Sequence, residues 1–178
     1  QLMKHQMRMY NCTSSYADRA EFFGEFFYIL LCGAGAGFSV QEHHIAKLPE
    51  IHQRTKQAKG YIVEDSIEGW ASALDVLMSS YFVGGGKYPD YEGRRVFFDL
   101  SQIRPKGAKI SGGFKAPGPE GLRRSLDKIE HLLQGIVLDS KEPVPIKPIN
   151  AYDICMHAAV QSYRLQTVSR SATSKCID

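Results

Sequence analysis

The 178-residue sequence predicts an α/β fold, because segments with the apolar spacing of helices alternate with short strand-like runs. Phenylalanines and leucines recur at i and i+4 over residues 22–31, and a glycine-rich turn at 33–37 precedes the strand-like residues 38–40. A second amphipathic face covers 67–81 and precedes the strand-like VFFDL at 96–100. With 43% hydrophobic residues, the chain is long enough to form one domain or part of one.

The stretch from Tyr10 to Val40 combines a cysteine, an apolar helix and a glycine-dense turn, an order that suggests a buried reaction pocket. Cys12 is expected to end a short strand, and the hydroxyl residues 13–15 to cap the following helix. The glycines of 33–37 should stop that helix and allow a ligand or another backbone to approach. From the residues alone, Cys12 is either a redox group or a small buried hydrophobe.

The polar segment 41–60 is expected to be a surface excursion with a short strand near residues 45–48. His43 and His44 invite a metal-binding interpretation. Adjacent side chains point apart in a strand, however, so surface or packing roles are favoured for both histidines.

Capping patterns place the starts of the remaining helices. Asp65 is the expected N-cap of the helix over 67–81, with Glu68 completing a capping box. The next helix should open at Pro119, bury a leucine and isoleucine stripe, and end at Gly135. Asn150 is the expected cap of the last helix.

Two segments lack a regular apolar period. Residues 101–118 hold four glycines, two prolines and four basic residues, a composition suited to binding phosphate groups. The alternative is a solvated connector whose lysines stay in water. Residues 162–178 are expected to form a loop that enters a strand.

Charge and cysteine usage exclude several classes of function. A formal net charge of +3 is too small to indicate nucleic-acid or membrane partners, and the longest apolar run is too short to span a bilayer. The four cysteines show neither C-x-x-C nor zinc-like spacing, so we expect no metal site and a cytoplasmic location. The start without methionine and the strand-like end predict a fragment of a longer protein.

Seven ordered blocks resemble the adenosylcobalamin-dependent (class II) ribonucleoside-triphosphate reductases, the monomeric branch of the ribonucleotide reductase family. The blocks are YNCTSSY, LCGAGAGFSV, HIAKLP, VEDSIEGWASALDVLMSSYF, FDLSQIRPKGAKISGG, APGPEGL and YDICMHAA. The resemblance covers nearly the whole chain and implies part of a ten-stranded α/β barrel with an inserted helical effector-binding region. It divides the chain into the barrel start (1–42), an insertion that mimics a dimer interface (43–103), and a barrel segment with the basic loop, two helices and a specificity loop (104–178).

The resemblance also implies roles for individual residues. Cys12 would be one member of the redox pair that reduces the ribose and is left as a disulfide. The substrate pocket would be lined by Asn11, Cys12, Thr13, Gly33, Ala34 and Gly35. The deoxynucleotide effector would be bound by Asp65, Ser66, Trp70, Arg104, Lys106 and Lys115. The specificity loop would contain Val168, Ser169, Arg170 and Ser171.

The implied activity is the conversion of ribonucleoside triphosphates to deoxyribonucleotides by a thiyl radical that adenosylcobalamin initiates. A dNTP effector would tune the substrate specificity of a monomeric enzyme, and a thioredoxin-like reductant would reduce the disulfide back to thiols. The sequence holds no N-P-C-G-E-like segment, so this part alone is expected to be inactive.

One segment departs from the family pattern, which is like A-G-G-V-R-R-S-A-T. Here residues 166–173 read QTVSRSAT, without the glycine pair that lets such a loop change shape. The alternative function is therefore a non-catalytic nucleotide-binding remnant or module, and a glycine-radical or iron-dependent reductase is a weaker alternative.

Overall fold

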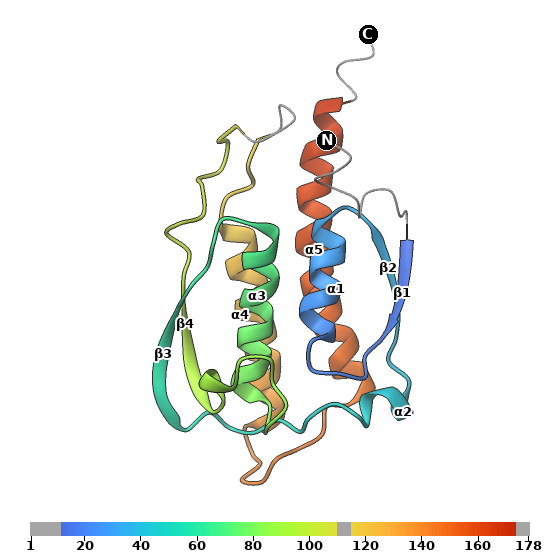
Figure 1. Ribbon diagram of the computed structural model, residues 1–178, viewed down its shortest axis with the longest axis vertical. Coiled ribbons are helices and arrows are strands. Elements are labelled where there is room, and N and C mark those ends of the chain that lie inside the picture. The colour runs from blue at the N-terminus through green and yellow to red at the C-terminus, as the bar shows by residue number, and fades with distance from the viewer. Residues whose placement is uncertain (1–11, 110–114, 174–178) are drawn as a thin grey trace.

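The computed structural model describes residues 12–109 and 115–173, with side chains described as far as residue 160. Four long helices form the centre, and a small sheet lies on each side of them (Figure 1). The helices are α1 (Phe22–Leu31), α3 (Ile67–Tyr81), α4 (Glu120–Val137) and α5 (Pro148–Thr173). The sheets pair β1 (Cys12–Tyr16) with β2 (Gly35–Ser39), and β3 (Lys56–Ile62) with β4 (Arg94–Asp99). The short elements are α2 (Glu42–Ile45) and the 3-10 helix η3 (Pro89–Tyr91).

This mixed composition confirms the predicted α/β class. Each sheet contains two parallel strands, and the strands of each pair are joined by a helix that crosses between them, as parallel pairing requires. The chain thus forms two β-α-β units, β1-α1-β2 and β3-α3-β4. The described residues do not close a barrel, so the ten-stranded barrel remains a prediction.

The core lies where the four helices meet. α1 packs against α3 and α5, while α4 packs against α5 and α3. The phenylalanine face of α1 is buried as predicted, since Phe22, Phe23 and Phe27 are at most 1% exposed. The predicted stripe of α4 and the predicted inward residues of α5 are also buried; they are Leu122, Leu126, Ile129, Leu133, Ile154 and Ala158.

The predicted role of the hydroxyl residues after Cys12 was wrong. Cys12 begins β1 instead of ending a strand, and residues 13–15 continue it. Their backbones pair with β2, so the hydroxyls are not at the start of α1, whose N-cap residue Glu21 makes no side-chain capping bond.

The predicted strand near residues 45–48 is also wrong, because the helix α2 ends at Ile45. Ile45 and Leu48 are both buried, and a separation of three residues suits one face of a helical turn better than a strand. As a result the rings of His43 and His44 do not point far apart, since their centroids lie 3.9 Å from each other.

The sequence interpretation missed β3, which lies in the predicted surface excursion. Its sequence, KQAKGYI, is mostly polar, and its residues are exposed or half-buried. The strand exists because it pairs with β4 over Lys59–Ile62 and at Lys56. The region predicted to be a helical insertion therefore contains a complete β-α-β unit.

Three predicted helix boundaries shift. Ser66, not Asp65, caps α3, because its Oγ accepts the Gly69 N–H at 2.9 Å. α4 runs past Gly135 to Val137, since one glycine lowers helix stability without ending the helix. Asn150 lies inside α5, and its Oδ1 accepts the Lys147 N–H at 3.2 Å, while Pro148 occupies the first turn.

The predicted specificity loop, residues 168–171, belongs to the helix α5. No glycine or proline occurs between Asn150 and Thr173, so no residue in this stretch favours a break in the helix. The expectation of a loop was therefore wrong for the backbone of residues 162–173, and the end of the segment, where the strand was expected, includes residues 174–178, which lie outside the described residues.

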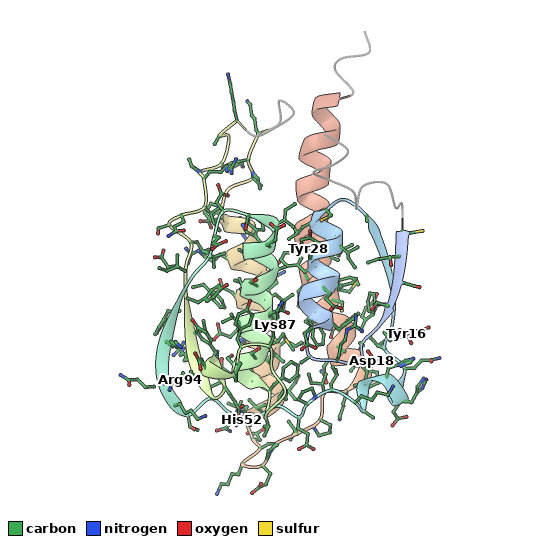
Figure 2. All side chains as sticks on the ribbon, in the orientation of Figure 1. Tyr16, Asp18, Tyr28, His52, Lys87 and Arg94 are labelled. Carbon is green, nitrogen blue, oxygen red and sulfur yellow. The ribbon has the colours of Figure 1, made fainter. Side chains whose placement is uncertain are left out.

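A buried carboxylate joins α3 to the rest of the bundle. Asp75 is 3% exposed, and its Oδ2 accepts a hydrogen bond from Lys87 Nζ at 2.8 Å. Figure 2 places Lys87 between α1 and α3. Burial raises the pKa of Asp75 to about 6, while Lys87 and the nearby Gly24 amide oppose this shift only in part. Within the described part of the chain, no hydrogen bond reaches Oδ1.

We expect this carboxylate to make folding stability fall as pH rises. Because the pKa of Asp75 is raised on folding, the folded chain holds a proton between about pH 4 and 6 that the unfolded chain has released. The stabilisation is full below the unfolded pKa and is lost as pH rises through about 6, amounting to about 1.5 kcal/mol between pH 5 and 8. Urea unfolding of the wild type and of Asp75→Asn measures this; parallel pH profiles of the two proteins would contradict it.

Candidate functional site

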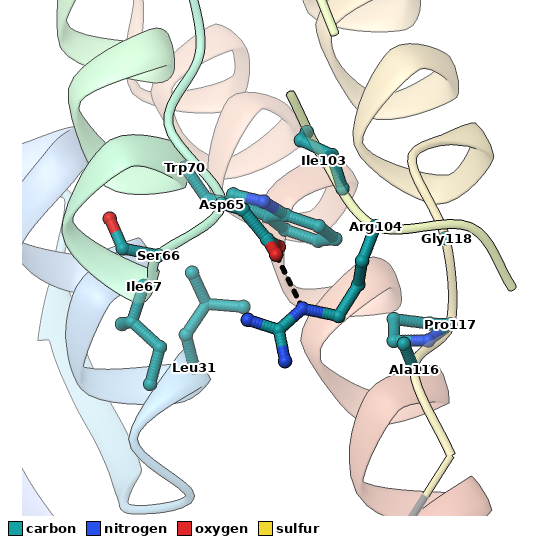
Figure 3. Close-up of a pocket in the computed structure, with 10 residues that line it drawn as sticks. All are labelled: Leu31, Asp65, Ser66, Ile67, Trp70, Ile103, Arg104, Ala116, Pro117 and Gly118. Atoms are coloured by element: carbon teal, nitrogen blue, oxygen red, sulfur yellow. Dashed lines mark hydrogen bonds and ion pairs between the residues drawn. The ribbon is translucent and has the colours of Figure 1, made fainter. Parts of the chain in front are cut away.

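A pocket of about 230 Å³ opens at the end of the bundle where α1 ends and α3 begins (Figure 3). The loop after β4 and the segment before α4 close its other side. The lining residues are Leu31, Asp65, Ser66, Ile67, Trp70, Ile103, Arg104, Ala116, Pro117 and Gly118. The pocket thus brings together four segments that are far apart in the sequence.

Four of the six predicted effector residues line this one pocket: Asp65, Ser66, Trp70 and Arg104. Lys106 and Lys115 do not line it. The Lys106 backbone lies against Gly118 at the pocket edge, where a Cβ on the glycine would meet the Lys106 nitrogen at 2.9 Å. Gly118 also has a φ of +78°, so both space and conformation favour glycine there.

The polar side of the pocket is an ion pair between Asp65 and Arg104, drawn as a dashed line in Figure 3. The Nε of Arg104 donates to Asp65 Oδ2. The Arg104 side chain is 43% exposed, and its two terminal nitrogens make no hydrogen bond within the described part of the chain. A guanidinium in this state can bind phosphate or carboxylate oxygens with those nitrogens.

The apolar side of the pocket offers a flat aromatic surface. Trp70 is 7% exposed, and its ring lies at the back of the pocket in Figure 3. Leu31, Ile103 and Pro117 surround the ring with apolar groups. A nucleobase can stack on such a surface while its polar edge stays hydrated.

Two helix N-termini also meet at the pocket. Ser66 is the N-cap of α3, and Gly118 immediately precedes Pro119, the N-cap of α4. The N-terminus of a helix carries a partial positive charge and unpaired N–H groups, which favour anions. The pocket therefore combines an anion-attracting side with an aromatic side.

The basic glycine-rich loop folds back on itself beside the pocket. The Gly107 N–H donates to the Ala116 carbonyl at 2.8 Å, and the Ala116 N–H donates to the Ala108 carbonyl at 2.7 Å. Lys109 and Lys115 form an isolated antiparallel bridge. Residues 110–114 lie outside the described residues, so the predicted loop is described only at its two arms.

Several lining residues were not among the predicted site residues. Leu31 comes from α1, and Ile103 and residues 116–118 lie on either side of the basic loop. Leu31 was identified only as an apolar helix position, and no motif marks it as part of a pocket. Its participation depends on how α1 packs against α3, which the spacing of residues does not reveal.

The predicted substrate residues gather at a different place. Cys12 is exposed on β1 and lies opposite Gly35 of β2, and Thr13 lies opposite Ala36. Gly33 has a φ of +88°, which explains the glycine at the end of α1, and Ala34 is 4% exposed. Asn11 lies outside the described residues.

Neither a metal site nor a membrane-spanning helix occurs among the described residues. Among the side chains of residues 12–109 and 115–160, no group of three or more histidine, cysteine or acidic residues is placed to bind a metal ion. Within the same ranges, none of the helices is both long and apolar enough to cross a bilayer.

Comparison with known proteins identifies relatives of this chain. The chain is 27% identical over 161 residues to the adenosylcobalamin-dependent ribonucleoside-triphosphate reductase of Lactobacillus gasseri, an alignment covering 71% of this chain and 21% of that protein. The reductase of the same name from Lactobacillus leichmannii is 27% identical over 157 residues, covering 71% of this chain and 20% of the relative. This chain therefore corresponds to about a fifth of the length of these relatives.

The fold also has a counterpart among solved structures. A B12-dependent (class II) ribonucleotide reductase crystal structure superposes with a TM-score of 0.67 at 24% identity, covering 80% of this chain and 23% of that one. Residues 39–133, just over half of the chain, match the family model described as the insertion domain of B12-dependent ribonucleotide reductase. The match includes the predicted insertion and most of the pocket lining. The chain therefore belongs to the B12-dependent ribonucleotide reductase family.

Proposed function

We propose that this chain is the part of an adenosylcobalamin-dependent ribonucleoside-triphosphate reductase that binds a deoxynucleoside triphosphate effector. The observation that carries the proposal is the single pocket in which Trp70, Arg104 and two helix N-termini meet. Each supplies one element of nucleotide recognition: a stacking surface, a cation and backbone donors. The curated relatives carry the name of this enzyme.

The size of the pocket suggests how a nucleotide would bind. A volume of about 230 Å³ is enough for part of a nucleotide, so the base is expected to stack on Trp70 and the phosphates to extend along Arg104. Lys106 lies just outside the pocket edge, and Lys115 begins the return arm of the basic loop. Both lysines are thus suited to bind the outer phosphates of a triphosphate.

The arrangement of the two β-α-β units supports the proposed insertion over 43–103. The unit β3-α3-β4 belongs to that region, and its helix packs against α1 of the unit β1-α1-β2 (Figure 1). Two similar units that pack through their helices resemble two subunits of a dimer. We propose that the insertion supplies within one chain what a partner subunit would otherwise provide, which suits a monomeric enzyme.

The cofactor of the whole enzyme does not fit the pockets described for this chain. The effector pocket and three others measure between about 200 and 350 Å³. Adenosylcobalamin is several times larger than a nucleotide and would need a larger cavity. We therefore propose that adenosylcobalamin binds residues outside this part of the enzyme.

We also propose that Cys12 faces the ribonucleotide substrate and that a thioredoxin-like donor restores its thiol.

We also propose a reduced role for residues 168–171 in specificity control. These residues lie in the last turns of α5, at the same end of the bundle as the effector pocket (Figure 1). A helix without glycine changes shape less readily than a glycine-containing loop. The effector bound in the pocket is therefore expected to influence substrate choice less than in enzymes with the glycine pair.

Calorimetry with each of the four dNTPs tests the proposed effector site. We expect the chain to bind at least one of them, and Arg104→Gln to weaken that binding about tenfold, because a charge-assisted hydrogen bond is lost. Lys128→Gln is the matched control, since Lys128 is exposed on α4 and does not line the pocket. If Arg104→Gln bound as tightly as Lys128→Gln, the pocket would not be the effector site.

A further inference from the structure

A second polar pocket lies at the opposite end of the bundle from the effector pocket. Its volume is about 270 Å³, and its lining residues are Gln53, Arg54, Tyr81, Arg95, Gln134, Val137 and Leu138. Tyr81 lies eleven positions after Trp70 in α3, which corresponds to about 16 Å along the helix. Figure 2 shows His52, two residues before Arg54, at this lower end.

Arg54 is a buried cation, and one of its N–H donor groups has no hydrogen-bond partner among the described residues. Its side chain is 6% exposed, its guanidinium lies 4.3 Å from the centre of the Tyr81 ring, and Nη2 pairs with Glu130 Oε1 at 2.5 Å. Nη1 is buried and has no hydrogen-bond partner among the described residues. A buried N–H without a protein partner costs free energy, so such a group usually indicates a bound water, ion or ligand.

Two further donors line the same pocket. Arg95 is exposed on β4, and its side chain makes no hydrogen bond or ion pair with the described residues; the side-chain amide of Gln134 makes none either. The Tyr81 hydroxyl donates to the Glu130 carbonyl at 3.3 Å. Burial raises the pKa of Tyr81 to about 12, so the phenol stays neutral and adds no negative charge.

The acceptors that lie closest to Arg54 and Gln53 already have partners. Glu130 is paired with Arg54, and the Val137 and Leu138 carbonyls at the end of α4 each accept a hydrogen bond from Gln53 Nε2 at 2.9 Å. These carbonyls reduce the attraction for an anion but do not cancel the charge of Arg95. The pocket therefore has more cationic donors than anionic acceptors.

We propose that this pocket binds a small oxyanion, a phosphate or carboxylate group, between the guanidinium groups of Arg54 and Arg95. Arg95 offers a planar fork that can bind two oxygens at once, Arg54 offers its unpartnered Nη1, and the Gln134 amide can donate to a further oxygen. Because Nη1 of Arg54 is covered, the exposed Arg95 is expected to bind the anion first. This site goes beyond the proposed effector function, since the two pockets share no residue.

Thermal unfolding of the chain in sodium phosphate, sulfate or acetate, each against sodium chloride at equal ionic strength, tests the proposal. A ligand that binds only the folded chain raises the unfolding midpoint in a saturable manner. We expect this rise in the wild type and in Arg124→Gln, an exposed charge-matched control on α4. Arg95→Gln should shift the half-saturating concentration upward about tenfold, and Gln134→Ala should shift it in the same direction.

The control separates binding from general salt effects, because phosphate and sulfate stabilise many proteins through exclusion from the surface. Such exclusion would raise the midpoint of Arg95→Gln as much as that of the wild type, and that result would overturn the proposal. A rise with all three oxyanions would assign a general oxyanion site, whereas a rise restricted to phosphate and sulfate would assign a phosphoryl group as the ligand.

Discussion

Replacing Gly24 with alanine is expected to lower the free energy of unfolding by about 3 kcal/mol, because α1 and the buried Asp75 leave no room for a methyl group. A Cβ at Gly24 would lie 2.0 Å from Asp75 Oδ1 and 2.3 Å from its carboxyl carbon. The Asp75 side chain is buried and held by Lys87, so relief of the clash requires α1 and α3 to move apart. Helix propensity alone would make the alanine variant more stable by about 1 kcal/mol. The expected change in the free energy of unfolding is therefore opposite in sign to the change that propensity would cause.

Gly135→Ala is the matched control for this substitution. Gly135 also lies inside a helix, but apart from its chain neighbours and the adjacent backbone of its own helix, no described atom lies within 4 Å of the position that its methyl group would occupy. We expect this change to raise stability by roughly 1 kcal/mol through helix propensity and reduced freedom of the unfolded chain. Urea unfolding of both variants measures the contrast, and a Gly24→Ala protein as stable as Gly135→Ala would contradict the close approach of α1 to α3.

A double variant shows whether Asp75 is the cause. If the clash with the carboxylate dominates, Asp75→Ala should cost less in the Gly24→Ala background than in the wild type, because the removed carboxylate makes room for the new methyl group. Additive effects of the two substitutions would place the cause elsewhere in the α1–α3 contact.

The helices could be predicted from the sequence because their apolar positions carry a strong period. The phenylalanines of α1 and the stripe of α4 are buried as expected, since each helix presents one face to a common core. Helix ends were less predictable. Asp65 and Ser66 are both residue types that cap helices, but Ser66 caps α3, whereas the Asp65 carboxylate pairs with Arg104 from a distant loop.

The strand β3 could not be predicted because its polar residues face solvent on an outer sheet. Its existence depends on pairing with β4, which begins 38 residues after β3 begins and has the apolar residues Val96 and Phe98. Long-range pairing of this kind leaves no local signature in KQAKGYI. The helix α2 was also missed because its conformation depends on distant contacts: Ile45 and Leu48 are buried against the core, and this burial favours a helix over a strand.

The pocket proposed to bind the effector could be predicted only in part from the residues. Composition indicated a phosphate-binding tendency for residues 101–118, and the resemblance added Asp65, Ser66 and Trp70. The pocket itself depends on Leu31 of α1 and on Arg104 crossing to Asp65, contacts between segments that are more than 30 residues apart in sequence. The proposed oxyanion pocket gave no sequence signal, because Arg54 looks like an ordinary surface charge until its burial is known, and nothing in the sequence shows that Arg95 lines the same pocket.

In the complete reductase, Cys12→Ser is expected to abolish repeated turnover with an external dithiol or thioredoxin-like reductant. Under the proposed function, each cycle leaves Cys12 in a disulfide, and a serine hydroxyl cannot form that bond. Exchange requires an accessible thiolate. Among the cysteines of the described residues, Cys12 is exposed, whereas Cys155 is fully buried, which raises the pKa of its thiol.

Cys32→Ser is the control for this prediction, because Cys32 is half-buried beyond the end of α1 and has no proposed role in the exchange. Its turnover should match that of the wild type. Unchanged turnover in Cys12→Ser would return Cys12 to a structural role in β1. A wild-type enzyme that binds dNTP but shows no turnover with any reductant would instead favour the nucleotide-binding remnant. Binding could persist without catalysis, because Cys12 lines neither the effector pocket nor the oxyanion pocket.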